Sequence, residues 1–167
     1  MIEKEKIAVL MVCMGNICRS PTAEAVLRHK LVQRGLGDRV QVDSAGTHAW
    51  HTGEAPDHRS RNHAGRRGYD LTGLRARLVH ATDFERFDLL LAMDEGNLSH
   101  LVAACPAAHR PKLRLLMDFA PKGVAREVPD PYGSGPEGFE QVLDMVESAC
   151  EGLIPHLRQI NGTKNPA

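Results

Sequence analysis

A cysteine and an arginine separated by five residues most constrain how this chain can fold. Cys13 follows an apolar run over residues 7–12 that is typical of a buried strand, and Arg19 ends the segment. Ser20 fits the N-cap of a following helix, and Pro21 fits its first position. In a strand, loop and helix of this kind, backbone N–H groups and the positive helix end converge on one point. We therefore expect a loop that binds an oxyanion and stabilises a thiolate at Cys13.

The remainder of the sequence alternates strand-like and helix-like segments, which is typical of a parallel sheet built from βαβ units. The apolar patterns predict strands over residues 7–12, 40–44, 87–93 and 112–117. They predict helices over residues 22–34, 59–67, 82–85, 97–104 and 139–160. A capping box at Thr82 is expected to open the third helix, and Pro155 is expected to kink or restart the last one.

These elements predict an α/β fold with one domain over residues 1–167. Its centre is a four-stranded, parallel, twisted sheet with helices on both faces and the anion-binding loop near the N-terminus. A chain of 167 residues is long enough to bury such a core without disulfides. The two ends, residues 1–5 and 161–167, are expected to fray.

The composition excludes several other classes of protein. Lys plus Arg equals Asp plus Glu at 21 each, so no overall positive field recruits nucleic acid. The N-terminus is charged, and the chain lacks a run of about 20 apolar residues that would span a bilayer. We expect a cytoplasmic protein without membrane insertion, whose four cysteines are thiols with Cys13 and Cys18 as the reactive pair.

Two polar loops should lie beside the anion-binding loop. Ligands of open parallel sheets bind at the carboxyl ends of the strands, and residues 44–56 and 127–136 follow two of the predicted strands. The second loop carries Asp130 between two prolines and beside Tyr132. This arrangement indicates a general acid next to an aromatic wall, although Asp-Pro is also ordinary turn chemistry.

Taken together, these motifs resemble the low-molecular-weight protein tyrosine phosphatase family over nearly the whole chain. The resemblance rests on the residues 13–19 with 20–24 behind them, 44–47, Trp50, 92–95 and 130–132, in that order. It implies a metal-independent and cofactor-independent enzyme that hydrolyses phosphotyrosine, an aryl phosphate monoester, through a phosphocysteine intermediate. The expected partner is a tyrosine-phosphorylated protein, and inorganic phosphate or similar oxyanions are expected inhibitors.

The resemblance also implies a role for individual residues. Cys13 attacks phosphorus as a thiolate, and Arg19 clamps the equatorial oxygens through its planar fork. Asp130 protonates the leaving phenolate and then deprotonates the water that hydrolyses the intermediate. Asn16 adopts a left-handed backbone and bonds to neighbouring loops, Ser44 among them. The phosphate-binding loop and its supports are Met14, Gly15, Asn16, Ile17, Cys18, Ser20 and Ser44.

Substrate choice should depend on the depth of the cysteine and on aromatic walls. A phosphotyrosine reaches a deep cysteine that a short phosphoserine cannot, and Trp50 and Tyr132 are expected to sandwich its ring. Ile17 lies where the related arginine-phosphate phosphatases tend to carry threonine, which favours an aryl ester.

Three positions bear on details of this family. Leu74 stands where the family often has a histidine that pins the loop asparagine, so we expect a less rigid loop. Gly133 replaces a second tyrosine, which predicts a wider site mouth on that side. Cys18 resembles the family's second loop cysteine, which traps an oxidised nucleophile as a disulfide, although it could simply pack under the loop.

Two other function classes use a similar loop. An arsenate reductase of this fold needs a closely spaced cysteine pair downstream, whereas here Cys105 stands alone and the next cysteine is Cys150. A silent phosphate-binding module would be expected to lose Cys13, Arg19 or Asp130, and all three are present. A metal site is not predicted, because the histidines lack paired zinc-ligand spacing; we expect solvated surface positions for His48, His51, His58 and His63.

Overall fold

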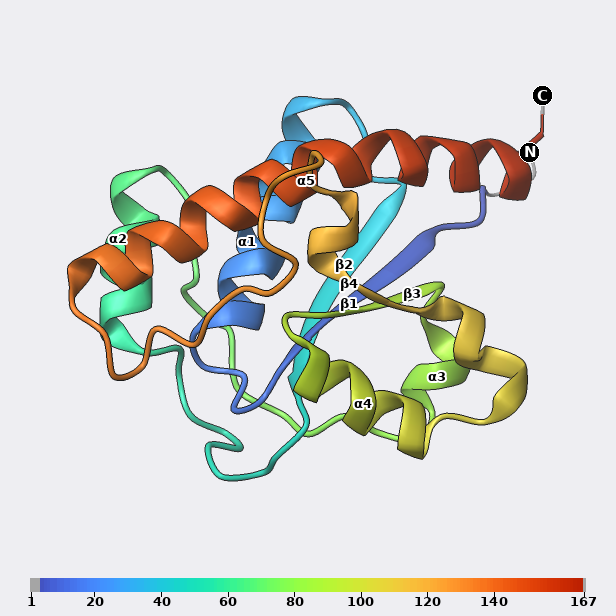
Figure 1. Ribbon diagram of the computed structural model, residues 1–167. Coiled ribbons are helices and arrows are strands. Elements are labelled where there is room, and N and C mark those ends of the chain that lie inside the picture. Colours follow the sequence, from blue (N-terminus) through green and yellow to red (C-terminus); the bar gives the residue numbers. More distant parts are fainter. Residues whose placement is uncertain (1–3, 167) are drawn as a thin grey trace.

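The computed structural model describes residues 4–166, and its strands form one parallel sheet in the order β2-β1-β3-β4 (Figure 1). The strands are β1 (Ile7–Cys13), β2 (Val40–Gly46), β3 (Leu89–Ala92) and β4 (Leu113–Leu115). β1 is central, since it pairs in parallel with both β2 and β3. The predicted four-stranded parallel sheet is confirmed.

Helices cover both faces of the sheet, as predicted. The α-helices are α1 (Arg19–Gln33), α2 (His58–Arg66), α3 (Asp83–Arg86), α4 (Glu95–Ala104) and α5 (Pro136–Lys164). Two 3₁₀ helices, η1 (Ala107–Lys112) and η2 (Leu116–Phe119), flank β4. In Figure 1, α1, α2 and α5 lie on one side of the sheet and α3 and α4 on the other. Within residues 4–166, the helices include none that is long and apolar enough to cross a membrane.

β1 is buried along its whole length because it contributes side chains to the cores on both faces of the sheet. Val9 and Met11 belong to the core formed with α1 and α5, whereas Leu10 and Val12 belong to the core formed with α3 and α4. The alternation follows from the two-residue period of a strand. A strand fixed from both faces ends at Cys13, so the position of this cysteine is determined by the packing of the whole domain.

Several predicted boundaries are wrong at the edge where the loops lie. β3 is shorter than predicted because Phe87 still caps the end of α3, and β4 is shorter because the chain turns into η2 directly after Leu115. α1 begins at Arg19, and the N-cap position belongs to Cys18 without any side-chain capping bond. The predicted cap at Ser20 is therefore wrong; its hydroxyl bonds to the loop instead. The capping box at Thr82 is also wrong, since this residue precedes α3 but makes no capping bond.

The C-terminal helix is longer than predicted. α5 runs as one element through Pro155 to Lys164, so the expected restart is absent and the expected fraying is wrong for residues 161–164. Asn165 exchanges hydrogen bonds of 2.9 and 3.0 Å with the backbone of Glu5, and Lys164 pairs with Asp88 at 2.9 Å. The bonds to Asn165 hold Glu5 beside the end of α5. Residues 1–3 and 167 of the predicted frayed ends lie outside the described residues.

Candidate active site

The loop between β1 and α1 is held by the side chain of Asn16. This asparagine has φ of 58°, and it is the one non-glycine residue with positive φ in residues 4–166. Its Nδ2 donates to Ser20 Oγ at 2.8 Å and to Ser44 Oγ at 3.0 Å, while its Oδ1 accepts from the backbone N–H of Arg77 at 3.0 Å. The expected left-handed backbone and the bond to Ser44 are both present, and together they fix the curve of the loop.

A second set of bonds supports Asn16 from behind. Ser44 Oγ donates to Glu24 Oε1 at 2.7 Å, and Glu24 also pairs with Arg28. Burial raises the pKa of Glu24, and the contacts with Ser44 and Arg28 act in the opposite direction. The amide of Asn16 is thus held on both sides without a histidine at position 74, where Leu74 packs against the core instead.

Cys13 lies at the bottom of this loop with 3% of its surface exposed. Its Sγ is 3.0 Å from Ser20 Oγ and accepts the backbone N–H of Asn16 at 3.3 Å. The sulfur also lies at the N-terminal end of α1, whose partial positive charge favours an anion. A backbone N–H, a hydroxyl within hydrogen-bond distance and a helix end facing one sulfur are the environment that stabilises a thiolate.

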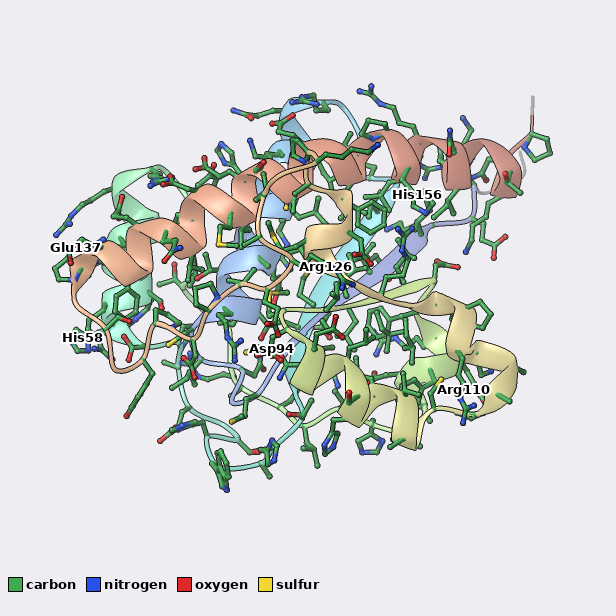
Figure 2. All side chains as sticks on the ribbon, viewed as in Figure 1. His58, Asp94, Arg110, Arg126, Glu137 and His156 are labelled. Carbon is green, nitrogen blue, oxygen red and sulfur yellow. The ribbon has the colours of Figure 1, made fainter. Side chains whose placement is uncertain are left out.

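Arg19 is 2% exposed and is fixed along one edge of its guanidinium. Nη1 donates to Asp94 Oδ2 at 2.6 Å and to the carbonyl of Val128 at 3.1 Å. Asp94 accepts the backbone N–H of Asn97 at the start of α4, and Figure 2 shows it in the middle of the molecule. Nη2 lies 4.0 Å from Asp130 Oδ2. One edge is therefore anchored, while the arginine also lines the pocket above the loop.

A pocket of about 230 Å³ opens above the loop. It is lined by Cys13, Met14, Gly15, Ile17, Cys18, Arg19, Trp50, His51, Asp130 and Tyr132. The structure therefore gathers almost every predicted site residue, from three separate loops, in one cavity. Asn16, Ser20 and Ser44 are buried behind the loop, where they support it.

The outer wall of the pocket is far more exposed than its floor. Asp130 accepts the backbone N–H of Tyr132 at 3.1 Å, and the carboxylate of Asp130 is 52% exposed. The guanidinium of Arg59 lies 5.4 Å from the centre of the Tyr132 ring, and Asp57 holds it through two bonds. Trp50 is 70% exposed, and its ring stacks on His48 at 4.6 Å.

His51 is the residue of the pocket that the sequence did not predict, and two of the histidines lie elsewhere than expected. His51, expected on the solvated surface, lines the pocket, and His63 is buried and pairs with Glu140. The position of His51 next to Trp50 on a predicted site loop was the available signal. The periodicity of α2 places His63 toward α5. In Figure 2, His58, the first residue of α2, lies on the same side of the molecule as Glu137, near the start of α5.

Cys18 differs from Cys13 although both belong to one loop. Burial raises the pKa of the Cys18 thiol to about 12, so this thiol stays protonated at neutral pH. Cys105 and Cys150 are buried too, and the four cysteines are free thiols. Cys13 differs from Cys18 in that its sulfur accepts a backbone N–H of the loop, that of Asn16.

The chain is similar to known proteins over nearly its full length. The family model for low molecular weight phosphotyrosine protein phosphatase matches residues 8–163. A low molecular weight protein-tyrosine-phosphatase of Streptomyces coelicolor is 44% identical, over 90% of this chain and 93% of the relative. A crystal structure of a protein tyrosine phosphatase from Entamoeba histolytica, with Hepes in the active site, has a TM-score of 0.90 at 40% identity. That match covers 92% of this chain and 98% of the other.

Another similar solved structure is named for a different phosphorylated residue. The Drosophila arginine phosphatase has a TM-score of 0.81 and 36% identity, covering 89% of this chain and 96% of the other. The same fold thus occurs in proteins named as tyrosine phosphatases and in one named as an arginine phosphatase. The family model nevertheless matches almost the entire chain, and relatives above 40% identity carry the tyrosine phosphatase name. This chain belongs to the low molecular weight phosphotyrosine protein phosphatase family.

Proposed function

We propose that Cys13, Arg19 and Asp130 carry out the phosphotyrosine hydrolysis of this family in this chain. The observation that supports the proposal most is the convergence of the three side chains on one pocket above a preorganised anion loop. Each comes from a different part of the chain: the end of β1, the start of α1 and the loop before α5. The rest of the chemistry follows from their positions.

In the first step, the Cys13 thiolate attacks phosphorus and a sulfur–phosphorus bond forms. The bond to the phenolic oxygen breaks, and Asp130 gives its proton to the departing phenolate. Charge on the equatorial oxygens is met by Arg19 and by the N–H groups of the loop. Because Arg19 is held by Asp94 and Val128, its fork needs little reorganisation when charge develops.

In the second step, Asp130, now a carboxylate, takes a proton from water. The resulting nucleophile attacks phosphorus, the sulfur–phosphorus bond breaks, and Cys13 leaves as a thiolate with inorganic phosphate as the product. The exposed position of Asp130 at the pocket mouth suits this role, since water and substrate both reach it. The product is also an oxyanion of the right shape to compete with substrate, so we expect inhibition by phosphate.

The pocket also favours an aryl phosphate. Cys13 is nearly inaccessible at its base, and Ile17 contributes an apolar wall. A short phosphoserine would have to bring its backbone into this opening, whereas a phenyl ring spans it. Phosphoarginine remains the nearest competing substrate, because an arginine phosphatase shares the fold.

Arsenate reduction has less support than hydrolysis. The reductase chemistry needs a closely spaced cysteine pair downstream of the anion loop, whereas Cys105 stands alone there. Cys105 is buried at 4% exposure, and its thiol donates to the carbonyl of Pro106. It lies at the end of α4, outside the residues that line the pocket. The presence of Asp130 at the pocket mouth also favours acid–base catalysis over passive phosphate binding.

Steady-state assays with four substrates test the proposal. Hydrolysis of p-nitrophenyl phosphate, phosphotyrosine, phosphoserine and phosphoarginine is measured in the presence of a chelator and a thiol reductant. We expect turnover of the two aryl phosphates alone. Preferential turnover of phosphoarginine would change the proposed substrate from phosphotyrosine to phosphoarginine. Absence of turnover with all four substrates would contradict hydrolysis by this site.

A further inference from the structure

We propose that the solvent face of α2 is a docking surface for acidic residues that flank the phosphotyrosine of a protein substrate. Arg61 and Arg66 are the residues that bind the carboxylates of such a substrate. This inference rests on the proposed function, because it names the class of substrate that the same pocket takes. The charge of α2, its ion pairs and its connection to the pocket support it.

α2 has basic side chains on its solvent face and no carboxylate of its own. His58, Arg61 and Arg66 are exposed, whereas His63 and Ala64 are buried against the core. At 3.6 residues per turn, the exposed residues lie on the side of the helix that faces away from the core. Because acidic and basic residues balance over the whole chain, this face is a local excess of positive charge.

The carboxylates that α5 presents to α2 are neutralised by a different arginine. Arg67, directly after the helix, pairs with three of them: Glu140, Asp144 and Glu147. Glu137, which Figure 2 shows on this side of the molecule, forms no ion pair with α2 within residues 4–166. Arg61 and Arg66 have no ion pair there either, so both guanidinium groups are available to a partner.

The N-terminal end of α2 lies at the edge of the catalytic pocket. The backbone N–H of Asp57, the N-cap residue of α2, donates to the carbonyl of Ile17 in the anion loop at 2.8 Å. Arg59, in the first turn, has its guanidinium 5.4 Å from the centre of the Tyr132 ring, and Tyr132 lines the pocket. A substrate chain that leaves the pocket past Tyr132 therefore meets α2.

The spacing of the two arginines suits a short acidic segment. Arg61 and Arg66 are five positions apart, which is about 7.5 Å along the helix axis. An extended peptide covers about 3.3–3.6 Å per residue, so two or three of its residues span this distance. A guanidinium also binds a carboxylate through two parallel N–H bonds, which favours glutamate or aspartate at these points.

A comparison of two phosphotyrosine peptides isolates the docking contact. The peptides have the same length, and the three positions on each side of the phosphotyrosine are glutamate in one and glutamine in the other. We measure kcat/KM for wild type and for the double variant Arg61→Gln/Arg66→Gln. The matched control is Arg110→Gln/Arg158→Gln, which changes the net charge equally at two exposed arginines outside α2. Figure 2 shows Arg110 on the opposite side of the molecule from His58.

We expect wild type to favour the glutamate peptide by about 2- to 10-fold at low ionic strength, the range for two exposed ion pairs. Salt should reduce this preference, because it screens exposed charges. The Arg61→Gln/Arg66→Gln variant should lose the preference, with the glutamine peptide and p-nitrophenyl phosphate within about twofold of wild type. The control should keep it. Arg61→Glu/Arg66→Glu should instead favour a peptide with lysine at the same positions.

Three results would overturn the assignment. Equal kcat/KM for the two peptides in wild type would show that the arginines are only solvated. An equal loss of preference in the control would assign the effect to net charge rather than to α2. Binding to phosphatidylserine vesicles that depends on Arg61 and Arg66, without a peptide preference, would assign the face to a membrane surface. Failure of the proposed function is distinguishable from each of these, because wild type would then turn over neither peptide.

Discussion

The floor and the rim of the pocket are built in opposite ways. On the floor, Asn16 is 3% exposed and Arg19 is 2% exposed, and each makes hydrogen bonds to groups far away in the sequence. On the rim, Tyr132 is 54% exposed and Trp50 is 70% exposed. The floor has a fixed geometry that matches a constant group, the phosphate. The rim has the freedom that a variable protein substrate requires.

The floor is more rigid than the rim because a misplaced floor costs more catalytic rate than a misplaced rim costs affinity. Charge that develops on a phosphoryl group is stabilised only by donors that are already in position, so a loose floor would lose rate. Stacking on a ring tolerates small displacements, so a loose rim loses little affinity. Changes on the floor are therefore expected to affect kcat strongly, and changes on the rim to affect KM mildly.

The largest effect is expected on the floor, from Cys13→Ser. Without the thiolate no phosphocysteine forms, so turnover of p-nitrophenyl phosphate should fall below detection. Binding of vanadate or phosphate, measured by calorimetry, should persist, because the loop donors and Arg19 remain. Cys105→Ala, at a buried cysteine outside the pocket, is the matched control and should keep its activity. Appreciable turnover by Cys13→Ser would dispose of the nucleophile assignment.

The next effect is expected where floor and rim meet, from Asp130→Ala. Removal of a general acid typically costs about 10²- to 10⁴-fold, and more for a leaving group that needs a proton. Phenyl phosphate should therefore lose more than p-nitrophenyl phosphate in single-turnover measurements. Glu127→Ala, on the same exposed loop but bonded to the backbone of Glu95, is the control. An equal loss for both leaving groups would argue against Asp130 as the acid.

A smaller effect is expected from the two substitutions Asn16→Gly and Asn16→Ala. Both remove the three side-chain bonds, each worth about 0.5–1.5 kcal/mol, but only alanine also carries the penalty of φ near 58°. That penalty is about 1–2 kcal/mol. The thermal unfolding temperature should be highest for wild type, lower for Asn16→Gly and lowest for Asn16→Ala, and kcat should fall in the same order. An alanine variant as stable as the glycine variant would show that the loop relaxes out of its left-handed turn.

The smallest effect is an expected absence of reaction at Cys18. Burial raises its pKa to about 12, which keeps the thiol protonated and unreactive. Between about pH 7 and pH 9, iodoacetamide should label Cys13 and leave Cys18 at baseline, as read by mass spectrometry of the peptides. Phosphate should protect Cys13 from the reagent. Labelling of Cys18 at a rate comparable with Cys13 would mean that its surroundings are more open than the structure shows.

The sequence predicted those parts of the site that depend on local spacing. The strand, loop and helix around Cys13 are contiguous, so their arrangement could be inferred from the apolar run and the Cys13 to Arg19 spacing. The order of the loops at one sheet edge then predicted that Asp130 and Tyr132 reach the same pocket. Family resemblance supplied the chemistry of each residue.

The remaining features depend on contacts between distant segments. The backbone of Arg77 holds Asn16 across 61 positions, and no local pattern signals such a bond. Ser20 was wrongly expected to cap α1 because its hydroxyl is shared between Cys13 and Asn16, which is visible only in the folded loop. The close approach of His51 to Gly15 likewise depends on how the loop after β2 folds back.

The most direct test of the proposed chemistry is to locate the phosphoryl group during turnover. Asp130→Ala is mixed with p-nitrophenyl phosphate, whose leaving group needs little acid, so the second step should become limiting and the intermediate should accumulate. The reaction is quenched within the first turnover, and the peptides are analysed by mass spectrometry. We predict a phosphoryl group on Cys13 in the Asp130→Ala variant. The double variant that also carries Cys13→Ser should show none. A phosphoryl group on another residue, or continued turnover with unmodified Cys13, would contradict the mechanism.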